Sequence, residues 1–205
     1  NTPIKESELK SQALDTIGHL AKAVGKERFA PYLVYYTEEA MKTITNESNY
    51  CMRETSFSYL CSISKFMKEE MAEIIPAIVE ACYFTIERND IKQVSPEEKA
   101  QEYSLDSDSE EEAVFGKVEA FDEKASALHC LGYMFKFCPN QMLPYLEGIS
   151  DIIMKMVQYV EDNVRFECIS TMTTITIGLN IFENGEDFEW LPGLADPTPI
   201  GEQTS

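Results

Sequence analysis

Basic residues are scarce in this sequence. Its 205 residues include 17 Lys and Arg against 36 Asp and Glu, a formal net charge of −19 at pH 7. A nucleic-acid binder needs clustered cations to displace the counterions of phosphate groups, and an anionic membrane surface also attracts cations. The composition therefore argues against both of these partners. It favours a basic partner, or a chain that gains solubility from its charge.

Long apolar runs, turn residues and paired cysteines are also few. No run of about 18 apolar residues occurs, so we expect no membrane insertion. Glycine and proline number nine each, which disfavours a turn-rich all-β fold. The six cysteines have no Cys-x-x-Cys spacing and lie mostly in apolar helical patterns. They predict buried free thiols in a reducing compartment, not disulfides or zinc ligands.

Catalytic motifs are missing from the sequence as well. His19 and His129 lie far apart and neither has a second histidine four residues away, so a metal pair is not indicated. No phosphate-binding loop, dinucleotide fingerprint or nucleophile elbow occurs. We therefore predict no cofactor, no metal and no enzymatic activity, with an all-helical enzyme fragment as the least favoured class. The first residues also lack an initiator Met and a signal-peptide core, which suggests a piece of a longer protein.

Apolar residues recur at spacings of three and four residues almost throughout, which predicts helices. Four helical segments share one pattern of small and apolar residues, and a Lys or Arg stands three residues before each start. The segments start at Ala13, Ser56, Ala127 and Cys168. The intervals between starts are 43, 71 and 41 residues, and two-helix repeats of the HEAT and armadillo type span roughly 40 to 47. The longer middle interval predicts an insertion.

The predicted fold is all-α: an α-solenoid of about three and a half HEAT-type helix pairs. In each pair, the first helix begins near a proline and the second begins near a Lys or Arg. The predicted helices span about 9–25, 28–45, 53–68, 71–88, 120–137, 141–160 and 163–182, with a short helix at 96–103. The array would occupy 1–182, with an acidic insertion at 89–119 between the two helices of one repeat. Residues 183–205 would form a linker or disordered tail.

Four stretches resemble the importin-β (karyopherin-β) family of nuclear transport receptors. They are LKSQALDTIGHLAKAVGKERFAPYL (9–33), EYSLDSDSEEE (102–112), FDEKASALHCLGYMFKFCPNQMLPYLEGI (121–149) and VRFECIS (164–170). The order of acidic insertion, "DEKASAL" helix, Pro-Tyr helix and "VR" helix is similar to the middle of the branch that imports ribosomal proteins and histones.

The resemblance implies a superhelical α-solenoid that acts as a binding scaffold. It implies basic protein cargo, namely ribosomal proteins or histones, and contacts of the full-length parent with the GTPase Ran and with Phe-Gly nucleoporins. It also implies a location in cytoplasm, nucleus and nuclear pore. The alternative is another HEAT scaffold, such as a phosphatase regulatory subunit or an adaptor protein.

The acidic insertion is the sharpest local feature. Its candidate site residues are Asp106, Asp108, Glu110, Glu111 and Glu112. Mutual repulsion of these carboxylates predicts an extended, solvated loop. Three hypotheses remain open: an inert loop, an electrostatic collector of basic cargo, or an autoinhibitory segment that docks on the receptor's own groove. Ser107 and Ser109 each precede a Glu by three residues, which makes them candidate sites of acidophilic phosphorylation.

The autoinhibitory hypothesis has its origin in the lining charges. The resemblance to the family implies that the second helix of each pair, which begins near a Lys or Arg, forms the inner lining of the solenoid. Seven cations and three carboxylates would face outward on them: Lys10, Lys22, Arg53, Lys65, Lys124, Lys136 and Arg165 against Asp15, Glu54 and Glu167. The lining would thus be mildly basic, and an acidic segment could dock on it.

Deletion of 104–113 separates the three hypotheses. Tighter binding of a basic peptide, measured by fluorescence anisotropy, would support docking because the competitor is gone. Weaker binding would support the collector, and unchanged binding the inert loop.

Overall fold

The computed structural model describes residues 3–46, 50–88 and 107–185, and side chains of the last range from residue 121 on. No strand occurs in these ranges, so the predicted all-α class is confirmed. The helices are α1 (Pro3–Val24), α2 (Lys26–Asn46), α3 (Tyr50–Met67), η1 (Lys68–Met71), α4 (Ile75–Glu87), α6 (Ser107–Phe137), α7 (Pro139–Met142), η2 (Leu143–Tyr145), α8 (Leu146–Met156) and α9 (Asp162–Asn184).

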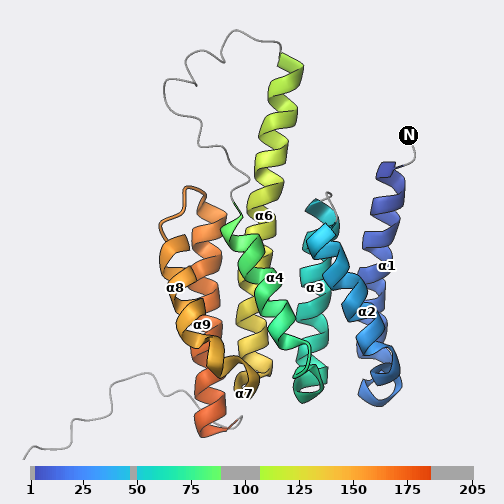
Figure 1. Ribbon diagram of the computed structural model, residues 1–205, viewed down its shortest axis with the longest axis vertical. Helices are drawn as coiled ribbons and strands as arrows, with labels where there is room; N and C mark the ends of the chain where they lie inside the picture. The colour runs from blue at the N-terminus through green and yellow to red at the C-terminus, as the bar shows by residue number, and fades with distance from the viewer. Residues whose placement is uncertain (1–2, 47–49, 89–106, 186–205) are drawn as a thin grey trace, which may run out of the picture.

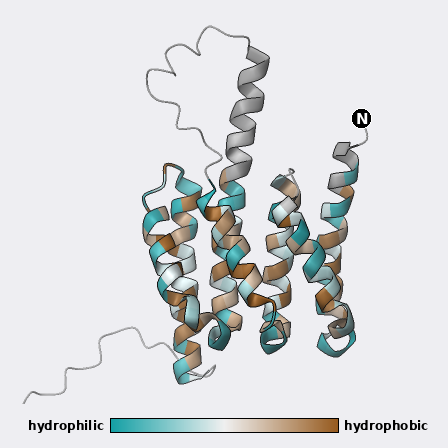
Figure 2. Cartoon of the chain, in the orientation of Figure 1, coloured by the Kyte–Doolittle hydropathy of each residue, from teal (hydrophilic) through white to brown (hydrophobic). Residues whose placement is uncertain are grey.

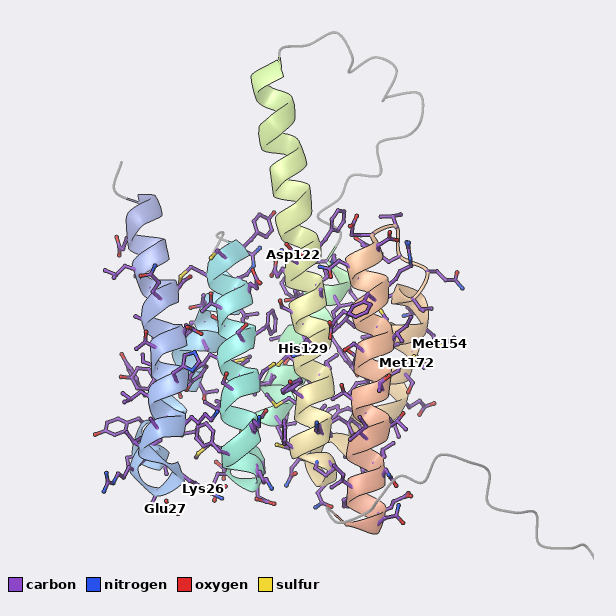
Figure 3. The ribbon with its side chains drawn as sticks, turned by 180° about the vertical axis from the view of Figure 1, so that it is seen from behind. Lys26, Glu27, Asp122, His129, Met154 and Met172 are labelled. Carbon is purple, nitrogen blue, oxygen red and sulfur yellow. The ribbon has the colours of Figure 1, made fainter. Side chains whose placement is uncertain are left out.

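The helices form two layers. One layer contains α1, α3, α6 and α9 side by side, each in contact with the next (Figures 1 and 3). The other contains α2, α4 and α8, which cover one face of the first layer and lie in front of it in Figure 1. We call these the lining layer and the outer layer. Apolar and polar residues intermix along each helix (Figure 2), as expected when one side of a helix is buried against its neighbours.

Neighbouring helices of the lining layer pack in a repeated register. A Cβ on Gly18, five residues after the first segment start, would lie 3.6 Å from Tyr59 and 3.7 Å from Ser62 of α3. The equivalent Gly132 of α6 meets the equivalent positions of α9, where Thr171 also donates a hydrogen bond of 3.1 Å to the carbonyl of Leu128. Successive helix pairs are thus related by translation, as in a HEAT-like solenoid.

The packing leaves the last helix of the layer with an exposed apolar side. Ile169 and Met172 of α9 are 58% and 45% exposed, and Met172 is labelled on that helix in Figure 3. Their equivalents in α6, Leu128 and Leu131, are fully buried. The same sequence pattern therefore has different burial depending on whether a following helix is present.

One helix is longer than predicted. The sequence placed its start near residue 120, but α6 begins at Ser107, so the second half of the acidic segment is helical and not extended. Glu and Ala are good helix formers, and carboxylates near a helix N-terminus are stabilised by the helix dipole. Residues 96–103 and 186–205, for which a short helix and a tail were predicted, lie outside the described residues.

Two helices predicted as continuous are interrupted. The segment 141–160 divides into α7, η2 and α8, because Pro144 has no N–H to continue an α-helical hydrogen-bond series. The segment 71–88 begins with η1 and a turn, and α4 starts only at Ile75, with Pro76 in its first turn. By contrast, Pro31 lies inside α2.

A pair of glycine substitutions tests the close approach of lining helices. Gly178→Ala would place a Cβ 2.8 Å from the Cα of Lys136 and 3.0 Å from the carbonyl oxygen of Phe135. We expect a loss of about 1–3 kcal/mol in unfolding free energy from this overpacking, measured by urea denaturation. Gly18→Ala, with only ordinary contacts, should be neutral or stabilise by up to about 1 kcal/mol. Equal losses in both variants would contradict the observed packing.

Thiol reactivity tests the predicted cysteine environment. All six cysteines are free; Cys51 is exposed and the other five are buried. Burial raises the pKa of Cys138 to about 12 and that of Cys168 to about 11, which removes the reactive thiolate at neutral pH. Ellman's reagent should therefore modify one thiol rapidly in the native protein and six after denaturation. Cys51→Ser should abolish the rapid phase, and persistence of that phase would refute the assignment.

Candidate functional site: the lining layer and the base of the insertion

A buried carboxylate joins three helices at the base of the insertion. Glu123 of α6 is 1% exposed and accepts hydrogen bonds from both sides. Arg53 of α3, 4% exposed, donates from Nε to Oε1 at 2.6 Å and from an Nη to Oε2 at 2.8 Å. Arg88, directly after α4, donates to Oε2 at 2.9 Å. Such a bidentate pair fixes both position and orientation of its members.

The next residue of α6 closes the end of α4. Lys124 is 2% exposed, and its Nζ donates to the carbonyls of Thr85, Ile86 and Arg88 at 2.9, 2.8 and 2.6 Å. The last carbonyls of a helix have no partner within it and carry partial negative charge, so the ammonium satisfies them. Arg88, which directly precedes the insertion, is thereby held against α6.

Two predicted lining cations are therefore not on the lining. Arg53 and Lys124 were expected to face outward, but both are buried in these contacts. A cation three residues before an apolar segment can lie on an exposed helix edge or in a buried contact, and the sequence pattern does not distinguish the two. The carboxylate of Glu123, adjacent to Lys124 in sequence, was the only local sign of a buried ion pair. Its two arginine partners are remote in sequence, however, so the pattern alone could not pair them.

An acidic pocket opens on the lining layer between α3, α6 and α9. It has a volume of about 240 Å³, and the carboxylates of three helices line it: Glu54, Asp122 and Glu167. Asn163 of α9 donates to Asp122 at 2.8 Å, and the Nδ1 of His129 lies 2.8 Å from Oε1 of Glu167. These contacts hold two of the carboxylates at the pocket wall (Figure 3 labels Asp122 and His129).

A second pocket adjoins the first, between α1, α3 and α6. It has a volume of about 330 Å³ and shares Ser58, Cys61 and His129 with the acidic pocket. Its charged and titratable side chains are His19, Lys22, Lys65, His129, Tyr133 and the thiol Cys61. The lining is therefore polarised into an acidic and a basic region, whereas the sequence predicted only that its net charge is mildly positive.

The predicted acidic site residues are remote from both pockets. Asp106 lies outside the described residues. Ser107, Asp108, Ser109, Glu110, Glu111 and Glu112 lie in the first two turns of α6. With a rise of 1.5 Å per residue, the backbone of Glu110 is about 18 Å along α6 from Asp122 of the acidic pocket and about 28 Å from His129. Their roles as collector, autoinhibitor or phosphosites stay predictions, although a helix N-terminus favours a phosphate group on Ser107 or Ser109.

The described residues show neither a membrane-spanning helix nor a metal-binding cluster. None of their helices is long and apolar enough to span a membrane. No three of their His, Cys, Asp and Glu side chains gather closely enough to hold a metal ion.

Comparison with known proteins shows a similarity over most of the chain. The chain is 28% identical over 211 residues to a protein of Schizosaccharomyces pombe described as probable importin subunit beta-4. The alignment covers 94% of this chain and 19% of that protein, so the chain spans about a fifth of its relative's length. No protein-family model matches the chain. The similarity supports the resemblance to the importin-β family, while the branch that imports ribosomal proteins and histones stays a prediction.

The buried ion pair leads to a stability prediction. Glu123→Gln removes the negative charge between two arginines, so we expect a loss of about 3–5 kcal/mol in unfolding free energy. Urea denaturation measures this loss, and Glu80→Gln, on the exposed side of α4, should change stability by less than about 0.5 kcal/mol.

A companion variant distinguishes charge burial from packing. Arg53→Met combined with Glu123→Met removes the two charges of the Arg53–Glu123 pair and should cost less than the single change Glu123→Gln. A double variant that is less stable than the single one would contradict an ion-pair role for Glu123.

Proposed function

We propose that this chain is part of a nuclear transport receptor of the importin-β type, a non-catalytic scaffold that binds protein cargo. The similarity to the probable importin subunit beta-4 over 94% of the chain carries this proposal. The helical layers support it, because a solenoid offers a long surface for partners instead of one enclosed site.

The cargo in this proposal is a basic protein segment, with ribosomal proteins and histones as the expected sources. The acidic pocket supports this class of cargo. Glu54, Asp122 and Glu167 converge from three helices on a space of about 240 Å³, and carboxylates form strong charge-assisted hydrogen bonds with Arg and Lys. The net charge of −19 would also speed the encounter with a basic segment.

Release of cargo would depend on the full-length receptor. We propose that Ran in its GTP form and Phe-Gly nucleoporins contact the parent protein, which would shuttle between cytoplasm and nucleus. A pull-down of the full-length parent with Ran-GTP and a basic peptide tests this step. Failure of the parent to bind Ran-GTP would instead favour another HEAT scaffold, such as a phosphatase regulatory subunit or an adaptor.

The acidic pocket can be tested on this chain directly. The triple variant Glu54→Gln, Asp122→Asn, Glu167→Gln should bind a fluorescein-labelled Lys/Arg-rich peptide at least about ten-fold more weakly than the unmodified chain, because charge-assisted contacts are lost. Fluorescence anisotropy at 0.15 M salt measures this effect, since that concentration screens long-range attraction.

The matched control removes the same amount of charge elsewhere. Glu73→Gln, Glu80→Gln and Glu147→Gln change three exposed carboxylates outside the lining layer. If both triple variants weaken binding equally, the peptide responds to net charge alone and the acidic pocket is not its site.

A further inference from the structure

The second pocket of the lining layer has a composition opposite to that of the whole chain. Its described lining residues are Gly18, His19, Lys22, Ser58, Cys61, Ser62, Lys65, His129 and Tyr133. None is Asp or Glu, although carboxylates outnumber Lys and Arg by 36 to 17 in the sequence. Lysine, serine and tyrosine side chains are hydrogen-bond donors, and histidine can donate as well. The Lys and Arg side chains of a basic cargo segment would find no carboxylate to pair with on such a surface.

The two pocket lysines also differ from most other cations of the protein. Lys10, Lys26, Lys42 and Lys155 each form an ion pair with a carboxylate. Within the described part of the chain, no such ion pair is found for Lys22 or Lys65, which occupy equivalent register positions on neighbouring helices. Their place in the last turns of α1 and α3 suits the helix dipole. No carboxylate lines the pocket between them, although Asp15 contacts the pocket residue His19, 3.6 Å from its Nε2.

The histidine at the boundary of the two pockets is held in a defined orientation. Because a carboxylate can only accept, His129 donates its Nδ1–H to Glu167. The ring also packs on Tyr133, with centroids 4.4 Å apart. Nε2 is then the ring atom free for another contact. The pocket wall from α6 is thus ordered by α9 before any ligand arrives, which reduces the entropic cost of binding.

We propose that this pocket binds an anionic side chain, a carboxylate or a phosphate group, presented by a peptide segment of a partner protein. Lys22 and Lys65 would supply the charge, and Ser58, Ser62 and Tyr133 the additional donors. The volume of about 330 Å³ is at the small end of the range for ligand pockets, which suits one such side chain. The acidic pocket next to it would accept a basic residue of the same segment.

The acidic residues in the first turns of α6 do not supply the anionic group. That helix is continuous from Ser107 to Phe137, and its first half extends beyond the other helices of the lining layer (Figures 1 and 3). Glu110 is 23 residues from Tyr133, or about 35 Å along the axis. The acidic segment of α6 therefore cannot reach the two lysines while the helix is intact.

The test uses ten-residue fluorescein-labelled peptides without Lys or Arg. One carries a central phosphoserine, one Asp-Asp at the same place, and one Ser-Ser; anisotropy is read at 0.15 M salt. The net charge of −19 repels all anions at long range, so tight binding of an acidic probe reports a local site. We expect the phosphoserine or the Asp-Asp peptide to bind at least about ten-fold more tightly than the Ser-Ser peptide.

The variants locate the site. Lys22→Gln with Lys65→Gln should abolish the preference for the anionic peptide, whereas Lys22→Arg with Lys65→Arg should retain it. Lys42→Gln with Lys155→Gln makes the same charge change on α2 and α8 of the outer layer and should also retain the preference. These lysines are exposed, and circular dichroism checks that each variant is folded.

The outcomes separate this proposal from the proposed transport function. Binding of the phosphoserine peptide alone identifies phosphate as the ligand chemistry, and binding of the Asp-Asp peptide alone identifies carboxylate. Equal affinity for all three peptides, or a preference that survives Lys22→Gln with Lys65→Gln, overturns the proposal. Because the probes contain no basic residue, a failure of the acidic pocket to bind basic cargo leaves this result unaffected.

Discussion

The carboxylate of Glu123 is the contact on which the arrangement of the central helices depends. It joins α3 to α6 through Arg53 and reaches the end of α4 through Arg88, while Lys124 closes the last carbonyls of that helix. An unpaired charge in this position would be strongly destabilising, so the four groups hold one another in place. The described residues on the two sides of the insertion, Arg88 on one and Glu123 and Lys124 on the other, are thus held together by direct contacts.

The same contacts give the lining layer its electrostatic pattern. Because Arg53 and Lys124 are withdrawn into the core, the exposed charges near them are the carboxylates of Glu54 and Asp122. Farther along the same helices, Lys22 and Lys65 line the adjoining pocket. Burial of two cations thereby converts a lining that was predicted to be mildly basic into one with a negative and a positive region.

The sequence was sufficient for the fold class and most helices, because each helix carries a buried apolar side with a recognisable period. It also revealed the repeat, whose equivalent positions Gly18 and Gly132 occupy equivalent contacts. The sequence was insufficient where a contact with a residue far away in the chain decides whether a side chain is buried or exposed. A buried cation such as Lys124 and an exposed one such as Lys65 occupy similar helical patterns, and only the tertiary contacts with α4 distinguish them.

The ends of some helices were also not predicted correctly from the sequence. The interruption at Pro144 separates α7 from α8, whereas Pro31 is tolerated inside α2, so proline alone did not identify the break. The extension of α6 to Ser107 was not predicted, because helix propensity and the helix dipole outweigh the mutual repulsion of the carboxylates there. The pockets depend on three helices at once, and no local pattern could have revealed them.

The translational register of the lining layer has a consequence for copies of the chain in solution. Inside the lining layer, each helix contacts the next through two different sides. At the ends of the layer these two sides are exposed: one on α9, with Ile169 and Met172, and the other on α1, with Thr16 and His19. These two sides are complementary but not identical, so an end-to-end contact would be heterologous and would not close into a ring unless the array curved back on itself. A charge of −19 on every copy opposes such open assembly. The acidity that first suggested a basic partner therefore also opposes end-to-end association of copies.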